Sequence, residues 1–474
     1  MKTTSIKATP MPYAKRWAAL AVLCAAQFMV IMDTSIIGVA LPAIQKDLGY
    51  TASSLQWIFN AYVILLGGLL LLGGKLSDIY GPRKIFMVGF GILTAASLLA
   101  GLAWSAPVLN TARALQGAGS ALIAPAALTL LMGMFTDPKE MAKAFGFWGA
   151  AAAAGGSAGV FLGGLLTEWA SWQWVFYINI PLGIIVMLVA PSLLLSGSKQ
   201  KGRVDLLGAL IATAALITLV YAIVTGEQAG WVSAQTLGLI ATALMLIIVF
   251  VQLQKRKDQP LVPLSIFKAV NLSAGNIVMA LMAAAWIPLW FYLNLYLQQT
   301  LKLSAFNSGL ALLPMTLVIM VLMVGVTGKL IQKLGFKANL IMGLFALTIS
   351  LFWFSAVPEN GSFLVHILGP SLLAAVGMSL AYIPGTIAAM SGAKPEETGL
   401  ASGLVNTSYQ IGSAIGLAIV VAVATATTNN LVSGGINMGT AMNSGFQTAF
   451  AIAGVISLLS VLYTIVFVKT PKAG

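Results

Sequence analysis

Asp33 is the only charged residue in the long apolar stretch AAQFMVIMDTSIIGVALP, residues 25–42. If this stretch crosses a membrane as a helix, an ionised carboxylate near its middle costs about 2.5–3.5 kcal/mol on insertion scales. Desolvation favours the neutral acid and a nearby cation favours the carboxylate, so a carboxyl group in this setting can take up and release a proton. We therefore interpret Asp33 as a proton-coupling residue. The alternative is a permanent pair that only packs the first helix against a neighbour.

Arg113 is the only basic residue expected at membrane depth, which makes it the predicted electrostatic partner of Asp33. Gln116, Gly117 and Ser120 follow Arg113 after three, four and seven residues, so they form one narrow polar face of a helix. A fixed structural pair is the alternative interpretation. Both interpretations can hold together, because an ion pair that breaks on protonation is also a switch.

Two polar stripes recur at helical spacing in the second half of the sequence, within residues 290–298 and 402–413. Together with tyrosines and amides elsewhere, they suit a cavity for lipophilic ligands with few hydrogen bonds, and aromatic faces would tolerate a cation. For each residue taken alone, packing or an interhelical hydrogen bond is the alternative. The predicted substrate-binding residues are Gln116, Asn60, Tyr62, Trp290, Asn294, Gln298, Tyr382, Asn406, Tyr409 and Gln410.

The composition places these residues in a membrane protein. The chain has 474 residues, of which 59% are hydrophobic and 8% charged, and its mean hydropathy is +0.96; soluble domains carry roughly 25% charged residues. Cys24 is the single cysteine, so an internal disulfide is excluded. The net charge of +13 indicates basic loops that face anionic lipid rather than a nucleic-acid partner. With one histidine and no metal-ligand spacing, we expect neither an enzyme nor a metal or other cofactor.

A hydrocarbon core of about 30 Å needs about 20 apolar residues of helix. That length predicts fourteen spans, at residues 16–43, 54–74, 84–104, 108–134, 141–166, 173–195, 205–225, 235–253, 271–298, 306–331, 338–357, 362–391, 399–427 and 446–468. With both termini in the cytoplasm, all of the 25 Lys and Arg residues fall on the inner side except Lys46, Lys302 and Arg113. The charge bias therefore supports an all-α membrane protein with this topology.

An internal repeat divides the chain. The loop GGKLSDIYGPRK, residues 73–84, resembles GKLIQKLGFK, residues 328–337, and aligning their glycines pairs Gly81 with Gly335. Repeats of this kind build alternating-access transporters with a site between two halves. We predict a six-helix bundle over residues 1–198, two inserted helices within 199–258, and a second six-helix bundle over 259–474.

Several stretches also resemble a known family. MDTSIIGVALP, GKLSDIYGPRK, LNTARALQGAGSA, WQWVFYINIPLG, PLVPLSIF and GLASGLVNTSYQIGSAIG occur in the order expected for the fourteen-spanner drug:proton antiporter branch of the major facilitator superfamily. The resemblance implies a major facilitator fold and proton-coupled efflux of lipophilic neutral or monocationic drugs by alternating access. It also implies a multi-pass protein of a bacterial plasma (inner) membrane that works as a monomer, with protons, a small-molecule substrate and membrane lipids as partners.

The repeated loop is a candidate gate. Asp78, at the inner end of the second span, can cap the N-terminus of a neighbouring helix or pair with Arg83 or Lys84, and Gly81 shapes the turn between them. A solvated turn without a gating role is the alternative. Gln332 occupies the position of Asp78 in the second copy, so we expect a weaker latch there.

Glycines are spaced along the fifth span, where they allow a close approach between helices. We interpret Gly155, Gly159, Gly163 and Gly164 as a sliding seam between the two halves; ordinary tight packing is the alternative. Val160 stands where the antiporter motif has a proline, so a uniporter or symporter remains an alternative to an antiporter. A dedicated exporter or flippase of one natural metabolite or lipid is a further alternative.

Overall fold

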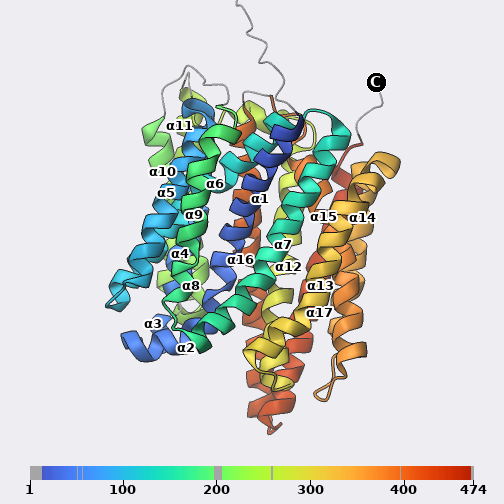
Figure 1. Cartoon of the computed structure of the whole chain (residues 1–474). Helices are drawn as coiled ribbons and strands as arrows, with labels where there is room; N and C mark the ends of the chain where they lie inside the picture. Colours follow the sequence, from blue (N-terminus) through green and yellow to red (C-terminus); the bar gives the residue numbers. More distant parts are fainter. Residues whose placement is uncertain are drawn as a thin grey trace, which may run out of the picture.

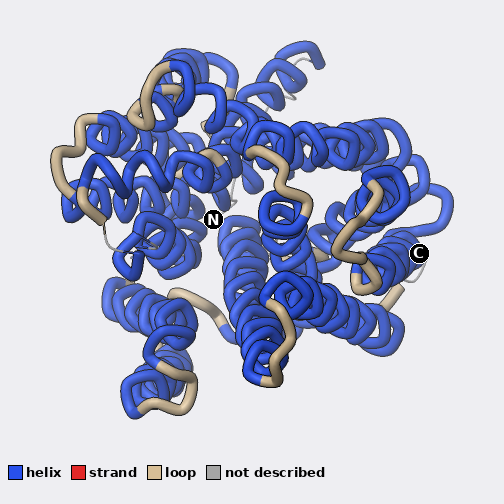
Figure 2. The backbone as a smooth tube through the Cα atoms, turned by 90° about the horizontal axis from the view of Figure 1, so that it is seen from below, coloured by secondary structure: helices blue, strands red, loops and turns tan. Residues whose placement is uncertain are grey.

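The computed structural model describes residues 13–50, 52–55, 57–196, 205–257, 260–394 and 397–470. These residues form helices joined by short loops, with no strand among them, as the view along the helices shows (Figure 2). Twelve of the helices in this part of the chain are long and apolar enough to cross a membrane. The fold is therefore an all-α bundle, and its first and last described residues lie at the same end (Figure 1).

The described residues of the N-terminal part form nine helices, some of which share one span. They are α1 (Tyr13–Ser35), α2 (Ile37–Leu48), α3 (Ala52–Leu55), α4 (Trp57–Tyr80), α5 (Pro82–Gly101), α6 (Ala106–Met134), α7 (Pro138–Trp169), α8 (Trp174–Tyr177) and α9 (Asn179–Leu193). Two further helices follow, α10 (Leu206–Ala229) and α11 (Ala234–Arg256).

In the C-terminal part, the described residues start with a short 3₁₀ turn and include three π-helical segments. Its elements are η1 (Leu264–Lys268), α12 (Leu272–Leu295), η2 (Tyr296–Thr300), α13 (Ala305–Leu322), η3 (Met323–Thr327), α14 (Gly328–Phe354), η4 (Phe363–Leu368), α15 (Gly369–Met390), α16 (Thr398–Ser433) and α17 (Met438–Phe467).

The structure confirms the fourteen predicted spans. The twelve long apolar helices include one that is long enough for two spans, and α10 provides the last. The helical run Phe306–Phe354 has 49 residues, about 74 Å at 1.5 Å per residue, which is twice what a bilayer needs. It is broken at Gly335, whose φ of 78° is not helical, so it provides two spans. The helix α10 adds the shorter apolar stretch Leu207–Ile223.

The break at Gly335 supports the internal repeat. Gly81, its partner in the sequence alignment, also has a positive φ, of 91°. A residue with a Cβ atom rarely adopts such a backbone conformation, so glycine is needed at both turns. Pro82 then starts α5 at its first helical position, where a missing N–H is harmless. The sequence places the second loop slightly early, because the helix continues to residue 334 before it turns.

The two parts of the chain meet along two seams, where α4 packs on α16 and α7 packs on α13. The helix α10 covers the first seam: it packs on α4 and also contacts α16. Asp205 caps α10 through Gly208 N and accepts hydrogen bonds from Gln254 and Lys257, which ties α10 to the end of α11. Burial alone would raise the pKa of Asp205, but these hydrogen bonds outweigh it and hold the pKa below its ordinary value.

Candidate functional site

The predicted partners Asp33 and Arg113 form a buried ion pair between α1 and α6. Arg113 Nη1 lies 2.6 Å from Asp33 Oδ2, and both side chains are 0% exposed. Removing two charges from water is costly unless further hydrogen bonds satisfy them. The second carboxylate oxygen, Oδ1, accepts hydrogen bonds from Gln116 Nε2 at 3.1 Å and from Asn179 Nδ2 at 2.7 Å. Three donors therefore satisfy the two oxygens of the Asp33 carboxyl group.

The guanidinium group of Arg113 is held equally closely. Its Nε donates to the carbonyl oxygen of Ile58 at 3.0 Å, and Nη1 also donates to Gln116 Oε1 at 2.8 Å. Its carbon lies 4.4 Å from the centre of the Tyr62 ring, which provides a cation–π contact. The Tyr62 hydroxyl in turn donates to Ser120 Oγ at 2.8 Å. Gln116 Nε2 also donates to Ser97 Oγ on α5 at 2.8 Å. Residues from α1, α4, α5, α6 and α9 thus converge on one charge pair.

Asn179 is a residue of this cluster that the sequence analysis did not single out. It is the first residue of α9 and is 0% exposed. Its Oδ1 and Arg113 Nη2 make no hydrogen bond within the described part of the chain. Buried polar atoms of this kind commonly bind water in proteins. The available signal was Asn179 itself, the one amide in the run VFYINIPLG, residues 175–183.

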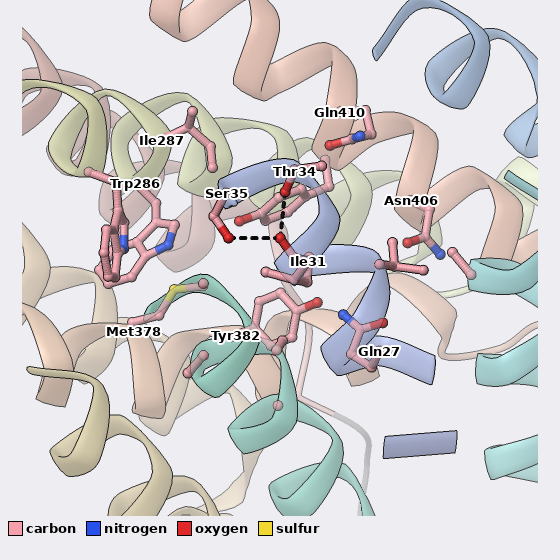
Figure 3. Close-up of a pocket in the computed structure, with 18 of the residues that line it drawn as sticks. Gln27, Ile31, Thr34, Ser35, Trp286, Ile287, Met378, Tyr382, Asn406 and Gln410 are labelled. Carbon is pink, nitrogen blue, oxygen red and sulfur yellow. Dashed lines mark hydrogen bonds between the residues drawn. The ribbon is translucent and has the colours of Figure 1, made fainter. Parts of the chain in front are cut away.

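A cavity of about 490 Å³ lies between the two parts of the chain, bordered by α1, α4, α6 and α7 on one side and by α12, α13, α15 and α16 on the other. None of its lining residues is charged. Six of the predicted substrate-binding residues line it: Trp290, Asn294, Tyr382, Asn406, Tyr409 and Gln410. Figure 3 shows this lining, in which α1 contributes Gln27, Thr34 and Ser35.

Aromatic rings form much of the cavity wall. Trp148 stacks on Tyr382 with 6.3 Å between ring centres, and Tyr382 meets the edge of Tyr409 at 6.0 Å. Trp286 and Trp290 are in edge contact at 6.1 Å. The amides and hydroxyls of the lining add a few hydrogen-bonding groups. Such a surface suits an amphipathic organic molecule.

The structure places the other four predicted substrate-binding residues elsewhere. Gln116 and Tyr62 belong to the ion-pair cluster, and Asn60 is not among the lining residues, although its neighbour Phe59 is. Gln298 is exposed. The stripe from Trp290 to Gln298 runs past the end of α12 at Leu295. Gln298 Nε2 still lies 3.5 Å from Asn294 Oδ1, but it is in the exposed π-helical turn beyond the cavity.

Asp33 lies next to the cavity, at the end of α1. Asp33 does not line the cavity, whereas Thr34 and Ser35, the next two residues, do. Both hydroxyls donate to the carbonyl oxygen of Ile31, at 2.7 and 3.1 Å (Figure 3), and Ser35 Oγ also contacts Gly155 O on α7 at 3.3 Å. Hydroxyls that bond back in this way compete with the helix and bend it. The helix α1 ends at Ser35.

The inner ends of the two parts are joined by Asp78. Its carboxylate accepts hydrogen bonds from Gly399 N at 2.9 Å and Leu400 N at 3.1 Å, in the first turn of α16. This is the helix cap expected as the first alternative, and the helix dipole favours a negative charge there. The backbones approach closely, because a Cβ atom added at Gly74 would lie 2.4 Å from Gly399 O.

The other predicted partners of Asp78 point elsewhere. Arg83 Nη1 donates to the carbonyl oxygens of Pro191 and Leu194, at 3.1 and 3.2 Å, where it caps the C-terminus of α9. Lys84 Nζ lies 5.7 Å from the Tyr80 ring.

The repeat does not reproduce this latch in the second copy. Gln332, which aligns with Asp78, is exposed. The helix that corresponds to α16 is α7, and its own Asp137 caps it by accepting from Lys139 N at 2.9 Å and Glu140 N at 3.0 Å. The two inner contacts between the repeats are therefore chemically different.

The predicted neighbour of the α7 glycines is wrong, because they do not lie between the two halves of the chain. A Cβ atom at Gly155 would meet Phe28 O at 2.5 Å, and one at Gly159 would meet Ser35 Oγ at 2.2 Å, so these glycines face α1 of the same bundle. Gly163 likewise faces Ile36, between α1 and α2, and Gly164 is buried. Spacing predicts a close approach but not which neighbour makes it.

A different face of α7 meets the second part of the chain. A Cβ atom at Gly146 would lie 2.3 Å from Met323 O, and the hydroxyls of Ser157 and Thr316 are hydrogen-bonded. Val160, in place of a proline, lines the cavity and packs near Gly309.

Helices packed around a polar-aromatic cavity, with a buried ion pair beside it, are typical of a membrane transporter. The chain belongs to the Major Facilitator Superfamily, whose family model matches residues 23–417. It is similar to the cephamycin export protein CmcT of Amycolatopsis lactamdurans, with 37% identity over 84% of this chain and 82% of that protein. It is also similar to the puromycin resistance protein pur8 of Streptomyces alboniger, with 34% identity over 85% and 80% of the two chains.

Solved structures show the same fold. The human organic anion transporter MFSD10 superimposes with a TM-score of 0.68 over 96% of this chain and all of its own, at 14% identity. The proton:xylose symporter XylE gives a TM-score of 0.66 over 97% of each chain, at 13% identity. With bacterial relatives and its apolar spans, the chain is a multi-pass protein of the inner membrane.

Proposed function

We propose that this transporter exports lipophilic neutral or monocationic antibiotics in exchange for protons, by alternating access. The observation that carries the proposal is the Asp33–Arg113 ion pair, buried next to an uncharged aromatic cavity between the repeats. The relatives named for cephamycin export and puromycin resistance support antibiotics as the substrate class. The proposed unit is a single chain, because both the ion pair and the cavity are built from its own residues.

Protonation of Asp33 would drive the conformational change. Once the carboxylate is neutral, the buried Arg113 loses its counter-charge, and an uncompensated buried charge costs about 3–5 kcal/mol. The cluster must then rearrange until the cation finds another partner or water. A sodium ion is a poor alternative to the proton here, because Arg113 Nη1 already lies 2.6 Å from the carboxylate.

The inner gate defines the state of the cycle. With Asp78 bonded to the first turn of α16, the two parts are joined at the inner side, so the cavity belongs to a state closed toward the cytoplasm. Opening inward would break both hydrogen bonds while the bundles 1–198 and 259–474 rock against each other. The inserted helices of residues 199–258 would move with α4, on which α10 packs.

Proton flux in everted membrane vesicles with an acidic interior tests the proposal. Lipophilic cations and neutral antibiotics are added outside, and the interior pH is followed for the wild type, Asp33→Asn and the matched control Glu359→Gln. Glu359 is an exposed acid outside the cluster. We expect substrates to release protons from vesicles of the wild type and the control but not of Asp33→Asn. Substrate uptake without proton movement in the wild type would refute antiport, and uptake limited to one compound would indicate a dedicated exporter.

A further inference from the structure

Two cations of the repeated loop make no ion pair with a carboxylate in the described part of the chain. Arg83 and Lys84 were predicted beside Asp78, but Asp78 caps α16 instead. None of the ion pairs among the described residues includes either cation. Their charges therefore remain available at the inner end of α5, a helix at the edge of the bundle (Figure 1).

A groove of about 490 Å³ lies beside these two cations. Its lining changes character along the helix. Tyr80, Arg83, Lys84 and Ser196 supply the polar part at the inner end, and Met87 and Val88 supply the apolar part. Val88 is four residues beyond Lys84, so it lies on the same face and about 6 Å deeper in the membrane. It is 43% exposed on a membrane-spanning helix, which places it against acyl chains.

The cationic part of the groove is held in place before any ligand binds. Arg83 uses Nη1 to bond two carbonyl oxygens at the end of α9, which leaves Nε and Nη2 of its planar fork without protein acceptors in the described chain. Lys84 is held near the face of Tyr80 at 5.7 Å. Arginine donors in such a fork match the oxygens of a phosphate, and a lysine adds a second charge.

We propose that this groove binds an anionic phospholipid of the inner leaflet, with its phosphate between Arg83 and Lys84 and one acyl chain along Met87 and Val88. A phospholipid has the same order of charge and apolar surface from the interface inward. The site is distinct from the substrate cavity and shares no lining residue with it. The proposal therefore stands whether or not the transporter exchanges protons.

Phospholipid titration of the purified full-length protein in neutral detergent, read by native mass spectrometry, tests the site. The variant Arg83→Gln/Lys84→Gln is compared with Lys329→Gln/Lys333→Gln, which makes the same charge change at exposed positions near the second repeat loop. Each cation near a membrane surface contributes about fivefold to anionic-lipid affinity. We expect phosphatidylglycerol to bind the first variant about 30-fold more weakly than the wild type or the control. Equal binding by all three proteins, or equal binding of phosphatidylcholine, would overturn the proposal.

Two further variants distinguish binding of a lipid from binding of a free anion, and they control for a folding defect in the double variant. Lys84→Gln alone leaves the Arg83 contacts to α9 intact, and we expect it to weaken phosphatidylglycerol about fivefold. Val88→Asp keeps both cations but opposes an acyl chain, and we expect it to weaken the lipid as well. If Val88→Asp has no effect and inorganic phosphate competes as well as the lipid does, the groove is a phosphate site and the lipid proposal fails.

Discussion

Asp33 and Thr34 are adjacent in the chain, yet their side chains lie in different environments. The Asp33 carboxylate is 0% exposed within the cluster around Arg113, whereas Thr34 lines the cavity. A substrate in the cavity therefore does not touch the carboxylate in this state. Any coupling between them must pass through the end of α1, where Thr34 and Ser35 bond back to Ile31.

The variant Asp33→Asn should lower stability more than it lowers substrate binding. It leaves Arg113 buried opposite a neutral amide, and breaking a buried pair in this way costs about 3–5 kcal/mol. The cavity lining is untouched. We expect a lower thermal unfolding midpoint in detergent, with the dissociation constant of a fluorescent substrate changed less than threefold. The double variant Asp33→Asn/Arg113→Gln should recover part of the lost stability, and a further loss would contradict this account.

Asn179→Leu should destabilise the cluster around Asp33. The residue is 0% exposed and donates to Asp33 Oδ1 at 2.7 Å. A hydrogen bond to a charged group contributes about 1.5–3 kcal/mol. We therefore expect a lower thermal unfolding midpoint in detergent than for the wild type. An unchanged midpoint would mean that Asn179 only packs.

The sequence predicts the elements of the site better than their contacts. Apolar run length predicts the fourteen spans, and the pairing of Asp33 with Arg113 follows because single charges at membrane depth need a partner. Asn179 is not distinguishable in this way, because an uncharged amide can hydrogen-bond to many kinds of group on a neighbouring helix and so does not identify its partner. Gln298 was misplaced because periodicity does not report where a cavity ends: Asn294 lines it, whereas Gln298, one turn further on, is exposed. The glycines of α7 were assigned the wrong neighbour because spacing contains no information on tertiary partners.

Asp78→Ala should open the inner side of the protein. Two hydrogen bonds from the first turn of α16 to a charged acceptor are lost, and each contributes about 1.5–3 kcal/mol. Ser402, whose Oγ contacts Pro125 O across the same seam, is a suitable reporter position. In a Cys24→Ser background, we expect alkylation of Ser402→Cys from the inner side to accelerate at least tenfold. Asp137→Ala is the control, because Asp137 caps only its own helix, and we expect this variant to leave the alkylation rate unchanged. Equal acceleration by both variants would exclude a specific contact between Asp78 and α16.

Gly159→Ala should destabilise the contact between α1 and α7. The added Cβ atom would lie 2.2 Å from Ser35 Oγ and 2.9 Å from Met32 O. Overpacking of this kind costs about 1–3 kcal/mol. Gly156→Ala is the matched control, because its Cβ atom would find its nearest neighbour at 3.9 Å. We expect a lower unfolding midpoint for the first variant only, and similar midpoints for both would show that α1 can move aside.

Charge movement should depend on the substrate. Asp33 is the only acid in the buried cluster, so at most one proton enters through it for each substrate that leaves. Exchange of a monocation for one proton then moves no net charge, whereas export of a neutral molecule moves one positive charge inward. Currents measured on proteoliposomes adsorbed to a supported membrane should be absent for a lipophilic monocation and present for a neutral antibiotic. A monocation current that grows with membrane potential would require a second coupling group, and its persistence in Asp33→Asn would place that group outside this cluster.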